Sequence, residues 1–503
     1  MNNGKICVSV CAKTANEFIE NIRRAEKFAD LIELRFDCLQ TAEIEKLLSK
    51  IKDFNCEFLI TFRPIEDGGN RQISRDERLN FWKIISQFDN AKVLDIEPNL
   101  QTVLNLSNVK SIIASFHDFR GVPKNLSEIY NNLDATDSEI IKIAVQANDI
   151  SDSITIWKLL IRAKSETKSF IPIAMGEAGK WTRILGLASG AFTTFASIDS
   201  NKEVAPGQVS AKDLIEVYRA KELDENTAVY GIIGNPVSHS VSPEMQNAAF
   251  KFHNLNAVYI PFEVQNLDEF ITRMVKPETR EIDLNFKGFS VTIPHKQSII
   301  KHLDFIDETA QQIGAVNTIK IVDGKLHGYN TDAQGFIEPL KNVYGDLRNA
   351  NVAILGAGGS ARACVFALKK VGANVTIFAR DSSKAKNLAE EFEIKLEDLS
   401  KIQNLKSKIH HDILVNTTPL GMKGKFEGET PVIAKQIENV KLVYDLVFNP
   451  FQTKFMTEAD KANVPKIAGM AMLIAQGMAQ FKIWTGKDAP MKEMSQAVLR
   501  KLS

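Results

Sequence analysis

The sequence predicts an α/β protein, with an N-terminal (β/α)8 TIM barrel followed by a two-lobed module that contains a Rossmann lobe. Two patterns lead to this prediction. Short apolar, β-branched runs alternate with amphipathic stretches over the first 220 residues, and a glycine-rich turn joins a strand to a helix near residue 356. The chain has 503 residues, which exceeds one ordinary domain.

Eight strand-like runs form the predicted barrel. They are rich in β-branched and aromatic residues and cover residues 6–10, 31–37, 58–63, 92–97, 111–117, 140–145, 170–176 and 192–198. Amphipathic stretches such as residues 15–30 lie between most of them and predict helices. Eight β-α steps favour a closed barrel, and a doubly wound sheet is the alternative.

A charged segment at residues 211–227 is interpreted as the last barrel helix running into a short, polar, exposed linker. A new strand is predicted at residues 228–234, and α/β alternation continues from there. The predicted domains cover residues 1–222, residues 227–335 completed by about residues 475–503, and residues 336–474.

The composition disfavours several classes of function. Lysine plus arginine and aspartate plus glutamate number 62 each, so neither a nucleic-acid nor a membrane partner is expected. No apolar run reaches the ~18 residues that cross a bilayer, and no signal-peptide core opens the sequence. The five cysteines match no zinc spacing and are expected to be reduced thiols of a cytoplasmic protein: Cys7, Cys11, Cys38, Cys56 and Cys364. No metal site is predicted, and the oligomeric state stays open.

Polar residues at the ends of the predicted barrel strands form the first candidate site. Chemistry in such barrels lies where strands end and loops begin. Six residues in or after successive strands qualify: Glu33, Arg35, Arg63, His117, Lys142 and Arg183. A single arginine at a strand end is more often a surface ion-pair partner. Six polar residues at the ends of strands would all point to one opening of the barrel, and surface ion pairs alone do not explain such a cluster.

Lys142 stands in the apolar run EIIKIAV at residues 139–145. Burying an ammonium group costs several kcal/mol unless the group is paired or loses its proton. A desolvated lysine amine among cations can attack a ketone and form a Schiff base, which acidifies the adjacent C–H bond. His117 is expected to move that proton, and the arginines are expected to bind a substrate carboxylate.

The motifs ELRFD (33–37), TFRPIEDGG (61–69), SFHDF (115–119), KIA (142–144) and APGQ (205–208) together resemble type I 3-dehydroquinate dehydratase over about residues 5–215. The resemblance implies that Lys142 forms the imine and that His117 is the general acid and base. It implies a substrate-binding role for Glu33, Arg35, Arg63, Asp67, Arg183 and Gln208. Asp67 stands where the family usually has Glu, and Val204 where it usually has Ser, which puts the rate in doubt more than the reaction.

The turn GAGGSA (356–361) follows a strand and opens a helix, so its backbone N–H groups and the helix N-terminus can hold a pyrophosphate. A tight turn without a ligand is the alternative. The second strand ends at Arg380, and with Lys384 it offers charge for a 2′-phosphate, which favours NADP. Asp381 leaves NAD as an alternative.

Seven further motifs accompany this turn: GIIGNPVSHSVSP (231–243), GFSVTIPHK (288–296), GAVNT (314–318), GYNTDAQG (328–335), VNTTPLGM (415–422), YDLVFNP (444–450) and GMAMLIAQG (469–477). Together they resemble shikimate dehydrogenase over about residues 228–503. The resemblance implies that Lys296 and Asp332 are the catalytic pair. It implies substrate binding by Ser238, Ser240, Thr292, Asn317 and Gln476, and NADP binding by Gly356, Ala357, Gly358, Gly359, Ser360, Ala361, Arg380, Lys384, Thr417 and Gly469. Ser290 and Phe448 stand where Asn and Tyr are common.

The two resemblances together imply a bifunctional enzyme of the shikimate pathway. The barrel would eliminate water from 3-dehydroquinate, and the second half would reduce the product, 3-dehydroshikimate, to shikimate with NADPH. Because the linker is expected to be exposed, the two reactions are expected to run in sequence without a sealed tunnel. The alternatives are a quinate-degrading enzyme that uses NAD and a metabolite-sensing pseudoenzyme. The pseudoenzyme is disfavoured because all four reactive residues are present.

Overall fold

The structure is a computed structural model that describes residues 2–86, 88, 91–101, 103–106, 109–199, 204–380, 382–400 and 408–502. The chain divides into two compact units. Unit 1 comprises Met1–Gly231, Asn235–His239 and Asn256–Phe286, and unit 2 comprises Ile232–Gly234, Ser240–Leu255 and Lys287–Ser503. The predicted three-domain boundaries stay a prediction.

Unit 1 contains the eight parallel strands expected of the barrel. Their sheet has the order β7-β6-β5-β4-β3-β2-β1-β8-β9, so successive strands are neighbours and β8 lies beside β1. The strands are β1 (Lys5–Val10), β2 (Leu31–Arg35), β3 (Phe58–Thr61), β4 (Ala91–Asp95), β5 (Ser111–Asp118), β6 (Ile140–Gln146), β7 (Ser169–Met175), β8 (Thr193–Ser197) and β9 (Val209–Ser210). A backbone hydrogen bond of 2.9 Å from Phe192 N to Phe170 O joins the segments of β7 and β8. The predicted strand positions and the parallel β-α order are therefore confirmed.

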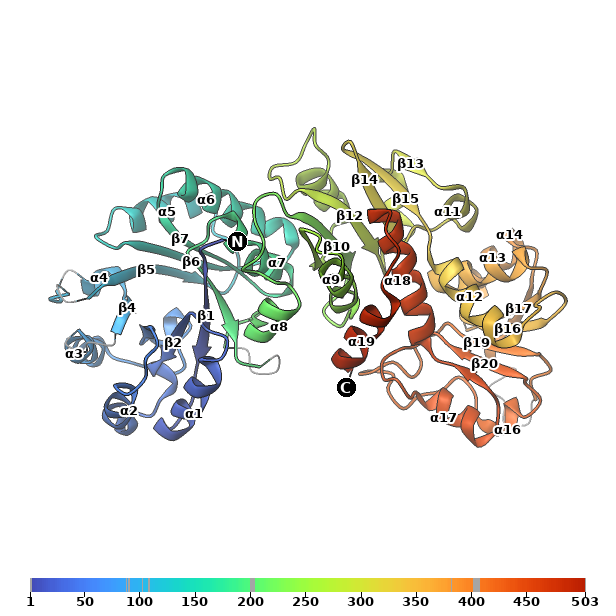
Figure 1. The fold of residues 1–503 in the computed structure, drawn as a ribbon, viewed down its shortest axis with the longest axis horizontal. Coiled ribbons are helices and arrows are strands. Elements are labelled where there is room, and N and C mark those ends of the chain that lie inside the picture. The colour runs from blue at the N-terminus through green and yellow to red at the C-terminus, as the bar shows by residue number, and fades with distance from the viewer. Residues whose placement is uncertain are drawn as a thin grey trace. The chain divides into compact units, whose positions relative to one another are not determined.

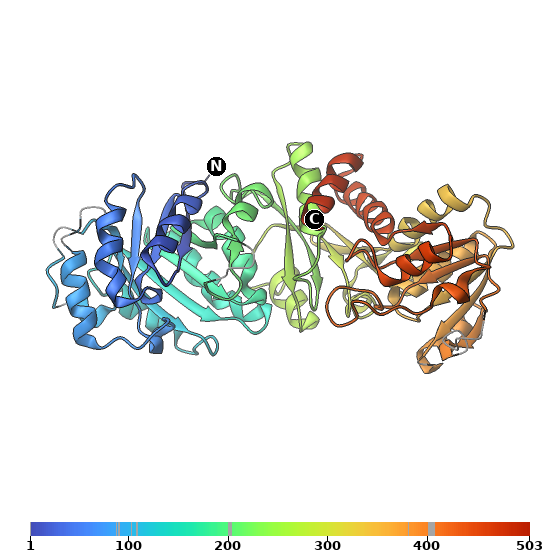
Figure 2. The same cartoon turned by 90° about the horizontal axis from the view of Figure 1, so that it is seen from below.

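Helices follow most of these strands and lie outside them (Figures 1 and 2). They are α1 (Ala15–Ala25), α2 (Ile44–Ile51), α3 (Arg75–Ile85), α4 (Pro98–Gln101), α5 (Leu126–Asp134), α6 (Ser153–Ser165), α7 (Lys180–Leu185) and α8 (Ala211–Glu216). In α1, Thr14 accepts a hydrogen bond from Glu17 N, and Phe18 and Ile22 bury one face.

The segment at residues 211–227 differs from its prediction. Helix α8 ends at Glu216, and Ala220 and Leu223 of the supposedly exposed linker are 0% and 2% exposed. The sequence of a charged segment does not show which of its apolar side chains become buried by packing against the rest of the protein. The expectation of an exposed linker is therefore wrong for Ala220, Leu223 and Thr227, whereas Lys221, Glu222, Glu225 and Asn226 are exposed.

A layer of apolar side chains fills the barrel interior, and we call this layer the barrel floor. Buried residues from all eight strands β1–β8 meet there, namely Cys7, Leu31, Leu59, Val93, Ile113, Ile140, Ala144, Ile171, Ile173, Met175 and Phe195. Because side chains alternate along a strand, Lys142 shares the inward face of β6 with Ile140 and Ala144. The alternation of side chains along β6 is therefore sufficient to point Lys142 into the barrel interior.

A six-stranded mixed sheet follows in the chain, with the order β11-β10-β12-β14-β15-β13. Its strands are β10 (Ala228–Gly234), β11 (Ala257–Glu263), β12 (Phe286–Val291), β13 (Phe305–Ile306), β14 (Thr318–Val322) and β15 (Lys325–Tyr329). The helices in this part of the chain are α9 (Ser242–Phe252), α10 (Leu267–Phe270) and α11 (Glu308–Ile313). Strand β14 runs antiparallel to both β12 and β15, which carries Asn317 and Lys296 toward the same side of unit 2.

The last sheet is parallel and has the order β18-β17-β16-β19-β20-β21, which is the Rossmann order. Its strands are β16 (Asn351–Leu355), β17 (Asn374–Ala379), β18 (Lys395–Asp398), β19 (Ile413–Asn416), β20 (Leu442–Asp445) and β21 (Lys466–Ile467). The helices of this region are α12 (Asp332–Tyr344), α13 (Gly359–Lys370), α14 (Ser382–Glu391), α16 (Ala434–Ile437), α17 (Lys454–Lys461), α18 (Gly469–Thr485) and α19 (Met491–Leu502).

Both faces of this sheet are covered. Val352 and Ile354 of β16 pack into the apolar cluster that includes α12 and α13, and Ala353 and Leu355 pack into the cluster that includes α16 and α17. Figure 1 shows α12 and α13 on one side of β16 and α16 and α17 on the other. The predicted Rossmann lobe is confirmed. Within the described residues, no helix is both long and apolar enough to cross a membrane.

Candidate active sites

Lys142 of β6 is buried and paired. Its Nζ lies 2.9 Å from Asp95 Oδ2 at the end of β4, and the two side chains are 4% and 1% exposed. The same Nζ lies 4.4 Å from the ring centre of Phe195 on the barrel floor. The ion pair offsets the cost of burying this ammonium group.

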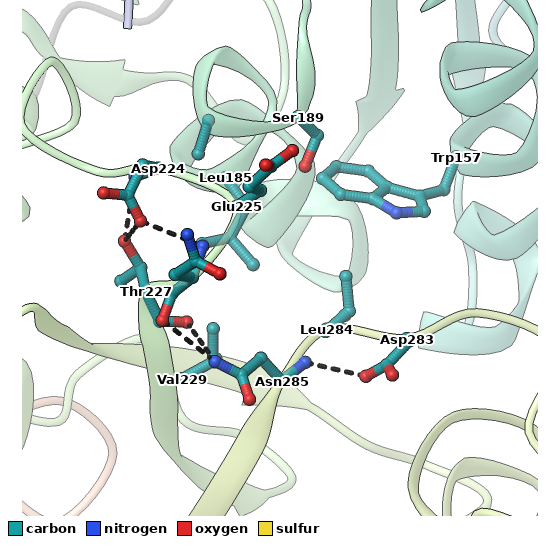
Figure 3. A pocket seen from close by; sticks show the side chains of 12 residues that line it. Trp157, Leu185, Ser189, Asp224, Glu225, Thr227, Val229, Asp283, Leu284 and Asn285 are labelled. Carbon is teal, nitrogen blue, oxygen red and sulfur yellow. Dashed lines mark hydrogen bonds between the residues drawn. The ribbon is translucent and has the colours of Figure 1, made fainter. Parts of the chain in front are cut away.

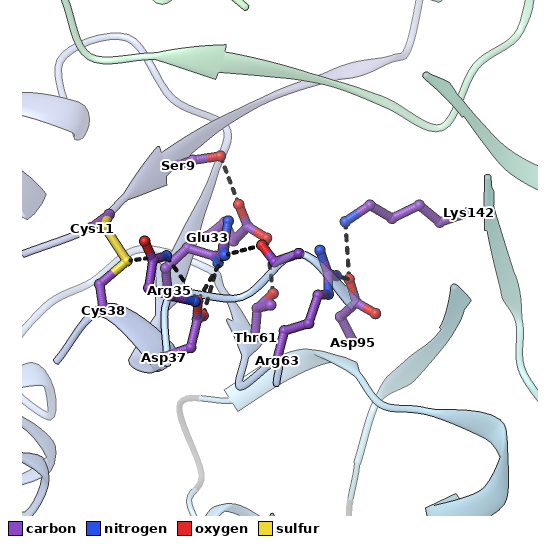
Figure 4. A network of polar contacts seen from close by, with 12 residues as sticks. Ser9, Cys11, Glu33, Arg35, Asp37, Cys38, Thr61, Arg63, Asp95 and Lys142 are labelled. Atoms are coloured by element: carbon purple, nitrogen blue, oxygen red, sulfur yellow. Dashed lines mark hydrogen bonds and ion pairs between the residues drawn. A yellow bond between two sulfur atoms is a disulfide. The ribbon is translucent and has the colours of Figure 1, made fainter. Parts of the chain in front are cut away.

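Asp95 connects three strands. Besides the hydrogen bond from Lys142, it accepts one from Arg63 Nη2 at 2.6 Å (Figure 4). Ser115 Oγ also donates to Asp95, at 2.6 Å. Burial alone would raise the pKa of Asp95, but Lys142 and Arg63 hold it well below its usual value. The carboxylate therefore stays charged.

The sequence prediction named Glu33 and several cationic residues around Lys142 but missed Asp95. The structure shows that the Asp95 carboxylate is the anion that pairs with both Lys142 and Arg63. Asp95 ends β4, so the strand-end criterion that selected the other residues also applies to it.

His117 lies on β5, two residues beyond Ser115, which faces Lys142 in the strand register. Its Nε2 atom is buried and makes no hydrogen bond with the described part of the chain. Burial, together with the charges of Arg63 and Lys142, lowers the pKa of His117 well below its usual value. The imidazole is therefore neutral near pH 7 and able to accept a proton.

Glu33 and Arg35 are both held rigidly at the end of β2. The carboxylate of Glu33 accepts hydrogen bonds from Ser9 Oγ at 2.6 Å and Thr61 Oγ1 at 2.9 Å. Arg35 donates to both oxygens of Asp37 at 2.9 and 2.7 Å. Burial opposes the charge of Arg35, but Asp37 raises the pKa of the guanidinium above its usual value. The two hydrogen bonds to Asp37 thus hold the positively charged Arg35 guanidinium in one position.

The remaining predicted residues of the barrel differ in burial. Arg183 lies on α7 and donates to Phe195 O at 3.5 Å and to Pro206 O at 3.3 Å. Gln208 accepts a hydrogen bond from Val204 N at 2.8 Å and donates to Ser9 Oγ at 3.4 Å. These two residues are buried, whereas Asp67 is exposed in the short 3-10 turn Ile65–Asp67.

Cys11 and Cys38 form a disulfide bond. This corrects the expectation of five reduced thiols. Strands β1 and β2 are parallel neighbours, so residues just beyond their ends approach each other, and the two Cα atoms lie 5.5 Å apart. The other three cysteines, Cys7, Cys56 and Cys364, are free thiols.

The second site is built around a shorter ion pair. Lys296, in the turn after β12, places Nζ 2.5 Å from Asp332 Oδ2 at the start of α12. The other oxygen of Asp332 accepts a hydrogen bond from Asn317 Nδ2 at 2.8 Å. Asn317 Oδ1 in turn accepts from Thr331 N at 2.8 Å. The predicted residues Lys296, Asp332 and Asn317 are therefore in direct contact.

Two residues that the sequence reasoning left without a role support this network. Ser290 Oγ donates to Gln480 Oε1 at 2.8 Å, and Gln480 Nε2 donates to Asn317 O at 3.2 Å. Both side chains are buried. Gln480 was missed because it lies in α18, far from Asn317 in sequence.

The other predicted substrate residues lie on loops and on α18. Ser238 is exposed, and Ser240 Oγ accepts a hydrogen bond from Ser242 N at 3.2 Å. Thr292 is half-buried in the turn that carries Lys296. Gln476 is half-buried on α18, where Gln476 Nε2 donates to Leu473 O at 2.9 Å.

The glycine-rich turn has the geometry of a phosphate cradle. Gly356 has φ +109°, and a Cβ there would lie 2.6 Å from Thr417 Oγ1. At Gly358, before the 12-residue helix α13, a Cβ would meet no described atom within 4 Å. A Cβ at Gly359 would lie 3.6 Å from Lys296 Cδ. The open helix N-terminus therefore lies beside the Lys296–Asp332 pair.

The remaining cofactor residues surround this turn. Ala357 and Ser360 are half-buried and Ala361 is buried in it, while a Cβ at Gly469 would approach Leu446 O to 2.6 Å. Arg380 is exposed just beyond β17, where a dinucleotide ribose is recognised in Rossmann folds. Asp381 and the side chain of Lys384 lie outside the described residues.

A separate cavity of about 390 Å³ in unit 1 includes none of the predicted site residues (Figure 3). Its walls include Trp157, Leu185 and Leu284. The Asp224 carboxylate at its edge already accepts hydrogen bonds from Asn226 N and Asn256 Nδ2, both at 2.9 Å. We assign no ligand to this cavity.

Comparisons with known proteins match both parts of the chain. The family described as type I 3-dehydroquinase matches residues 6–225. The shikimate dehydrogenase substrate binding domain matches residues 232–319, shikimate/quinate 5-dehydrogenase matches residues 338–420, and the shikimate 5′-dehydrogenase C-terminal domain matches residues 469–499.

Individual relatives extend these matches. The shikimate dehydrogenase (NADP(+)) of Methanocaldococcus jannaschii is 43% identical over 286 residues, which cover 56% of this chain and 99% of that protein. A crystal structure of a shikimate dehydrogenase in complex with NADP+ has a TM-score of 0.50 and 40% sequence identity, and the match covers 56% of this chain and 98% of that one.

One relative covers nearly the whole sequence. The chloroplastic bifunctional 3-dehydroquinate dehydratase/shikimate dehydrogenase of Arabidopsis thaliana is 34% identical over 525 residues, which cover 99% of this chain and 85% of that protein. The order of the two activities in its name is the order of the two family matches along this chain. The chain therefore belongs to the family of bifunctional 3-dehydroquinate dehydratase/shikimate dehydrogenases.

Proposed function

We propose that this chain dehydrates 3-dehydroquinate to 3-dehydroshikimate in unit 1 and reduces that product to shikimate with NADPH in unit 2. The observation that carries the proposal is the buried Lys142–Asp95 pair, with its 2.9 Å contact, beside the neutral His117. A buried lysine next to a neutral base is the arrangement that imine chemistry requires.

In the dehydration, the Lys142 ammonium gives one proton to His117, and the amine so formed attacks the substrate ketone. His117 returns that proton to the former ketone oxygen, which leaves as water and gives a cationic imine. The cationic imine draws electrons from the adjacent carbon and acidifies its C–H bond. Asp95 remains a carboxylate because its pKa is held low, so it stabilises this cation and does not serve as the proton acceptor.

His117 then removes the proton next to the imine, and the same proton returns to the departing hydroxyl, which leaves as water. A second water hydrolyses the imine and frees Lys142 and the product. The lowered pKa of His117 supports its role as the acceptor. The net change is the loss of one water molecule.

Fixed cations and polar groups hold the substrate in this scheme. We assign the substrate carboxylate and hydroxyls to Glu33, Arg35, Arg63, Asp67, Arg183 and Gln208. Arg35 is prepared for a carboxylate because Asp37 already holds its fork in place. Asp67 is exposed, so its role requires the turn at residues 65–67 to close over the substrate.

In unit 2, the glycine turn and Arg380 fit a dinucleotide that carries a 2′-phosphate. The positive φ of Gly356, the open space at Gly358 and the N-terminus of α13 support this fit. Gly356, Ala357, Gly358, Gly359, Ser360, Ala361, Arg380, Lys384, Thr417 and Gly469 would hold NADP. When bound, NADPH supplies the hydride.

Lys296 is the proton donor to the ketone oxygen during reduction. Asp332 orients the Lys296 ammonium through their 2.5 Å contact, and Asn317 fixes the Asp332 carboxylate from the other side. We assign Ser238, Ser240, Thr292, Asn317 and Gln476 to the hydroxyls and carboxylate of shikimate.

The proposed division of labour follows the predicted domains: residues 1–222 for dehydration, residues 227–335 with about residues 475–503 for the reductase substrate, and residues 336–474 for NADP. Small molecules are the proposed partners, without nucleic acid or membrane. A cytoplasmic location also remains a proposal, and the disulfide does not favour it, because disulfides are rare there except in transient or redox-sensing roles.

A steady-state assay with 3-dehydroquinate, run separately with NADPH and NADH, tests the proposal. We expect dehydration without any nucleotide, and oxidation of NADPH once 3-dehydroshikimate has formed. Faster turnover with NADH and with quinate would instead favour the quinate-degrading alternative. Failure of both reactions in folded protein would favour the pseudoenzyme.

A further inference from the structure

We infer that the Cys11–Cys38 disulfide is a reversible redox site that controls substrate binding in the dehydratase half. The inference rests on the proposed dehydration, because it acts through Arg35. Its basis is a short line of contacts that connects this disulfide to that arginine, all within unit 1 (Figure 4).

The line of contacts begins at Asn70. Its Nδ2 donates to Cys38 Sγ at 3.2 Å and to Asp37 Oδ2 at 3.0 Å, and its backbone N donates to the same Asp37 oxygen at 3.0 Å. Asp37 is also bonded covalently to Cys38 through the chain. The disulfide therefore holds Asp37 through both the backbone and a side-chain contact.

Asp37 is the group that fixes Arg35. The two side chains are 0% and 6% exposed and form a two-pronged pair at 2.9 and 2.7 Å. Arg35 Nη2 also lies 3.5 Å from Gly68 O, in the turn next to Asp67. A displacement of Cys38 consequently reaches both a substrate-binding arginine and the turn expected to close over the substrate.

Cys11 and Cys38 are also among the cysteines that are only partly buried, together with the free thiol Cys56. Cys11 and Cys38 are half-buried, whereas Cys7 and Cys364 are fully buried and burial raises the pKa of both thiols. Burial and the nearby Glu26 raise the pKa of Cys56 to about 12, so that thiol is a poor nucleophile at neutral pH.

The redox step is thiol–disulfide exchange with a dithiol reductant. One thiolate of the reductant attacks a sulfur of the Cys11–Cys38 bond and forms a mixed disulfide, and the released cysteine takes up a proton. The second thiol of the reductant then displaces the other cysteine. The protein gains two electrons and two protons, and the dithiol becomes a cyclic disulfide.

Once reduced, the two sulfurs no longer share a bond and must separate. Asp37 and Asn70 lose a fixed neighbour, so Arg35 is less well placed for the substrate carboxylate. Lys142 on β6 keeps its ion pair with Asp95, and His117 lies on β5, three strands away from β2 in the sheet. Reduction should therefore raise the KM for 3-dehydroquinate and change kcat little.

The test compares oxidised full-length protein with protein reduced by dithiothreitol, and both activities are measured in each state. Alkylation and mass spectrometry should count three free thiols in the first state and five in the second. We expect the KM for 3-dehydroquinate to rise at least about fivefold on reduction, with reduction of 3-dehydroshikimate unchanged. Equal KM values in verified oxidised and reduced protein would overturn the inference.

Three variants sharpen this test. Cys11→Ser and Cys38→Ser should each show the high KM without reductant and no longer respond to it, while Cys56→Ser should respond as the parent does. A redox response that persists in Cys11→Ser contradicts the inference. Hydrogen exchange of β1 and β2 reports whether unit 1 of each variant is folded, and the reductase activity reports the same for unit 2. Absence of dehydration in both redox states, with reductase activity present, would instead refute the proposed dehydratase function.

Discussion

The two units each use a lysine–aspartate pair, but the surroundings of the pairs differ. Lys142 and Asp95 are 4% and 1% exposed, and Arg63 binds the same carboxylate oxygen at 2.6 Å. Lys296 and Asp332 are 15% and 8% exposed, and the second partner of Asp332 is the neutral amide of Asn317. The Asp95 carboxylate therefore pairs with two cations, whereas the Asp332 carboxylate pairs with one.

This difference matches the two kinds of chemistry. One anion shared by two buried cations leaves excess positive charge, and that charge contributes to the lowered pKa of His117. Such a site favours the neutral form of His117, which can then accept a proton. One lysine balanced by one carboxylate in a more open site suits a protonated lysine that donates to an oxygen.

Replacing Lys142 gives the largest expected effect and tests whether it is the nucleophile. Lys142→Ala should lower the rate of dehydration by roughly a thousandfold or more, because the imine can no longer form. Reduction of 3-dehydroshikimate by the same variant should keep its rate. Separate assays of the two reactions provide the measurement and its control.

Borohydride trapping tests the same assignment without a mutation. Borohydride added with 3-dehydroquinate should leave a mass adduct on Lys142 and inactivate only the dehydratase. A stable adduct on another lysine would refute the assignment of Lys142 as the imine-forming residue.

Replacing Lys296 tests the opposite role. Lys296→Ala should lower kcat for reduction by about 100- to 1000-fold, as expected for loss of a positioned proton donor. Binding of shikimate, measured by calorimetry, should weaken far less. Equal losses in rate and affinity would show that Lys296 binds substrate and does not act in the chemical step.

A matched pair of stability variants probes the difference in burial directly. Asp95→Asn leaves Lys142 and Arg63 buried without an anion, which should destabilise unit 1 locally by about 3–5 kcal/mol. Asp332→Asn leaves only the more exposed Lys296 unpaired and should cost about 1 kcal/mol. Hydrogen-exchange mass spectrometry of β4–β6 and of α12 measures the two local effects. Similar losses of local stability in the two variants would contradict the proposed difference between the Lys142–Asp95 and Lys296–Asp332 pairs.

The sequence predicted this architecture well where local pattern decides it. The run at residues 140–145 became β6 at Ile140–Gln146, because a strand buried on both faces needs continuous apolar residues. The motifs that contain Lys296, Asp332 and Asn317 predicted one site, and the three side chains are in contact. The motifs form turns whose geometry depends mainly on residues close in sequence, so the positions of these side chains could be predicted.

Partners that depend on tertiary contacts were missed. Asp95 and Asp37 each lie at or just beyond a strand end, but nothing local shows which cation each one holds. Cys11 and Cys38 are 27 residues apart, and only the parallel pairing of β1 with β2 brings them together. Likewise, the charged run at residues 211–227 hid two buried residues, Ala220 and Leu223.

The smallest expected effect is a shift in pH dependence. Because burial and the charges of Arg63 and Lys142 lower the pKa of His117, the acid limb of kcat/KM for dehydration should lie below the ordinary imidazole value of about 6.5. Arg63→Ala removes one of those charges, so it should move the limb upward even though it also weakens substrate binding.

The same shift has a consequence for stability. Below about pH 6.5 the unfolded chain binds a proton on this histidine before the folded chain does, so stability should fall as the pH drops toward the lowered pKa. His117→Asn should remove that part of the pH dependence in unit 1, as judged by hydrogen exchange of β5. An acid limb at or above about 6.5 in the parent protein would show that the excess positive charge does not reach His117, and the contrast between the two lysine sites would then lose its electrostatic basis.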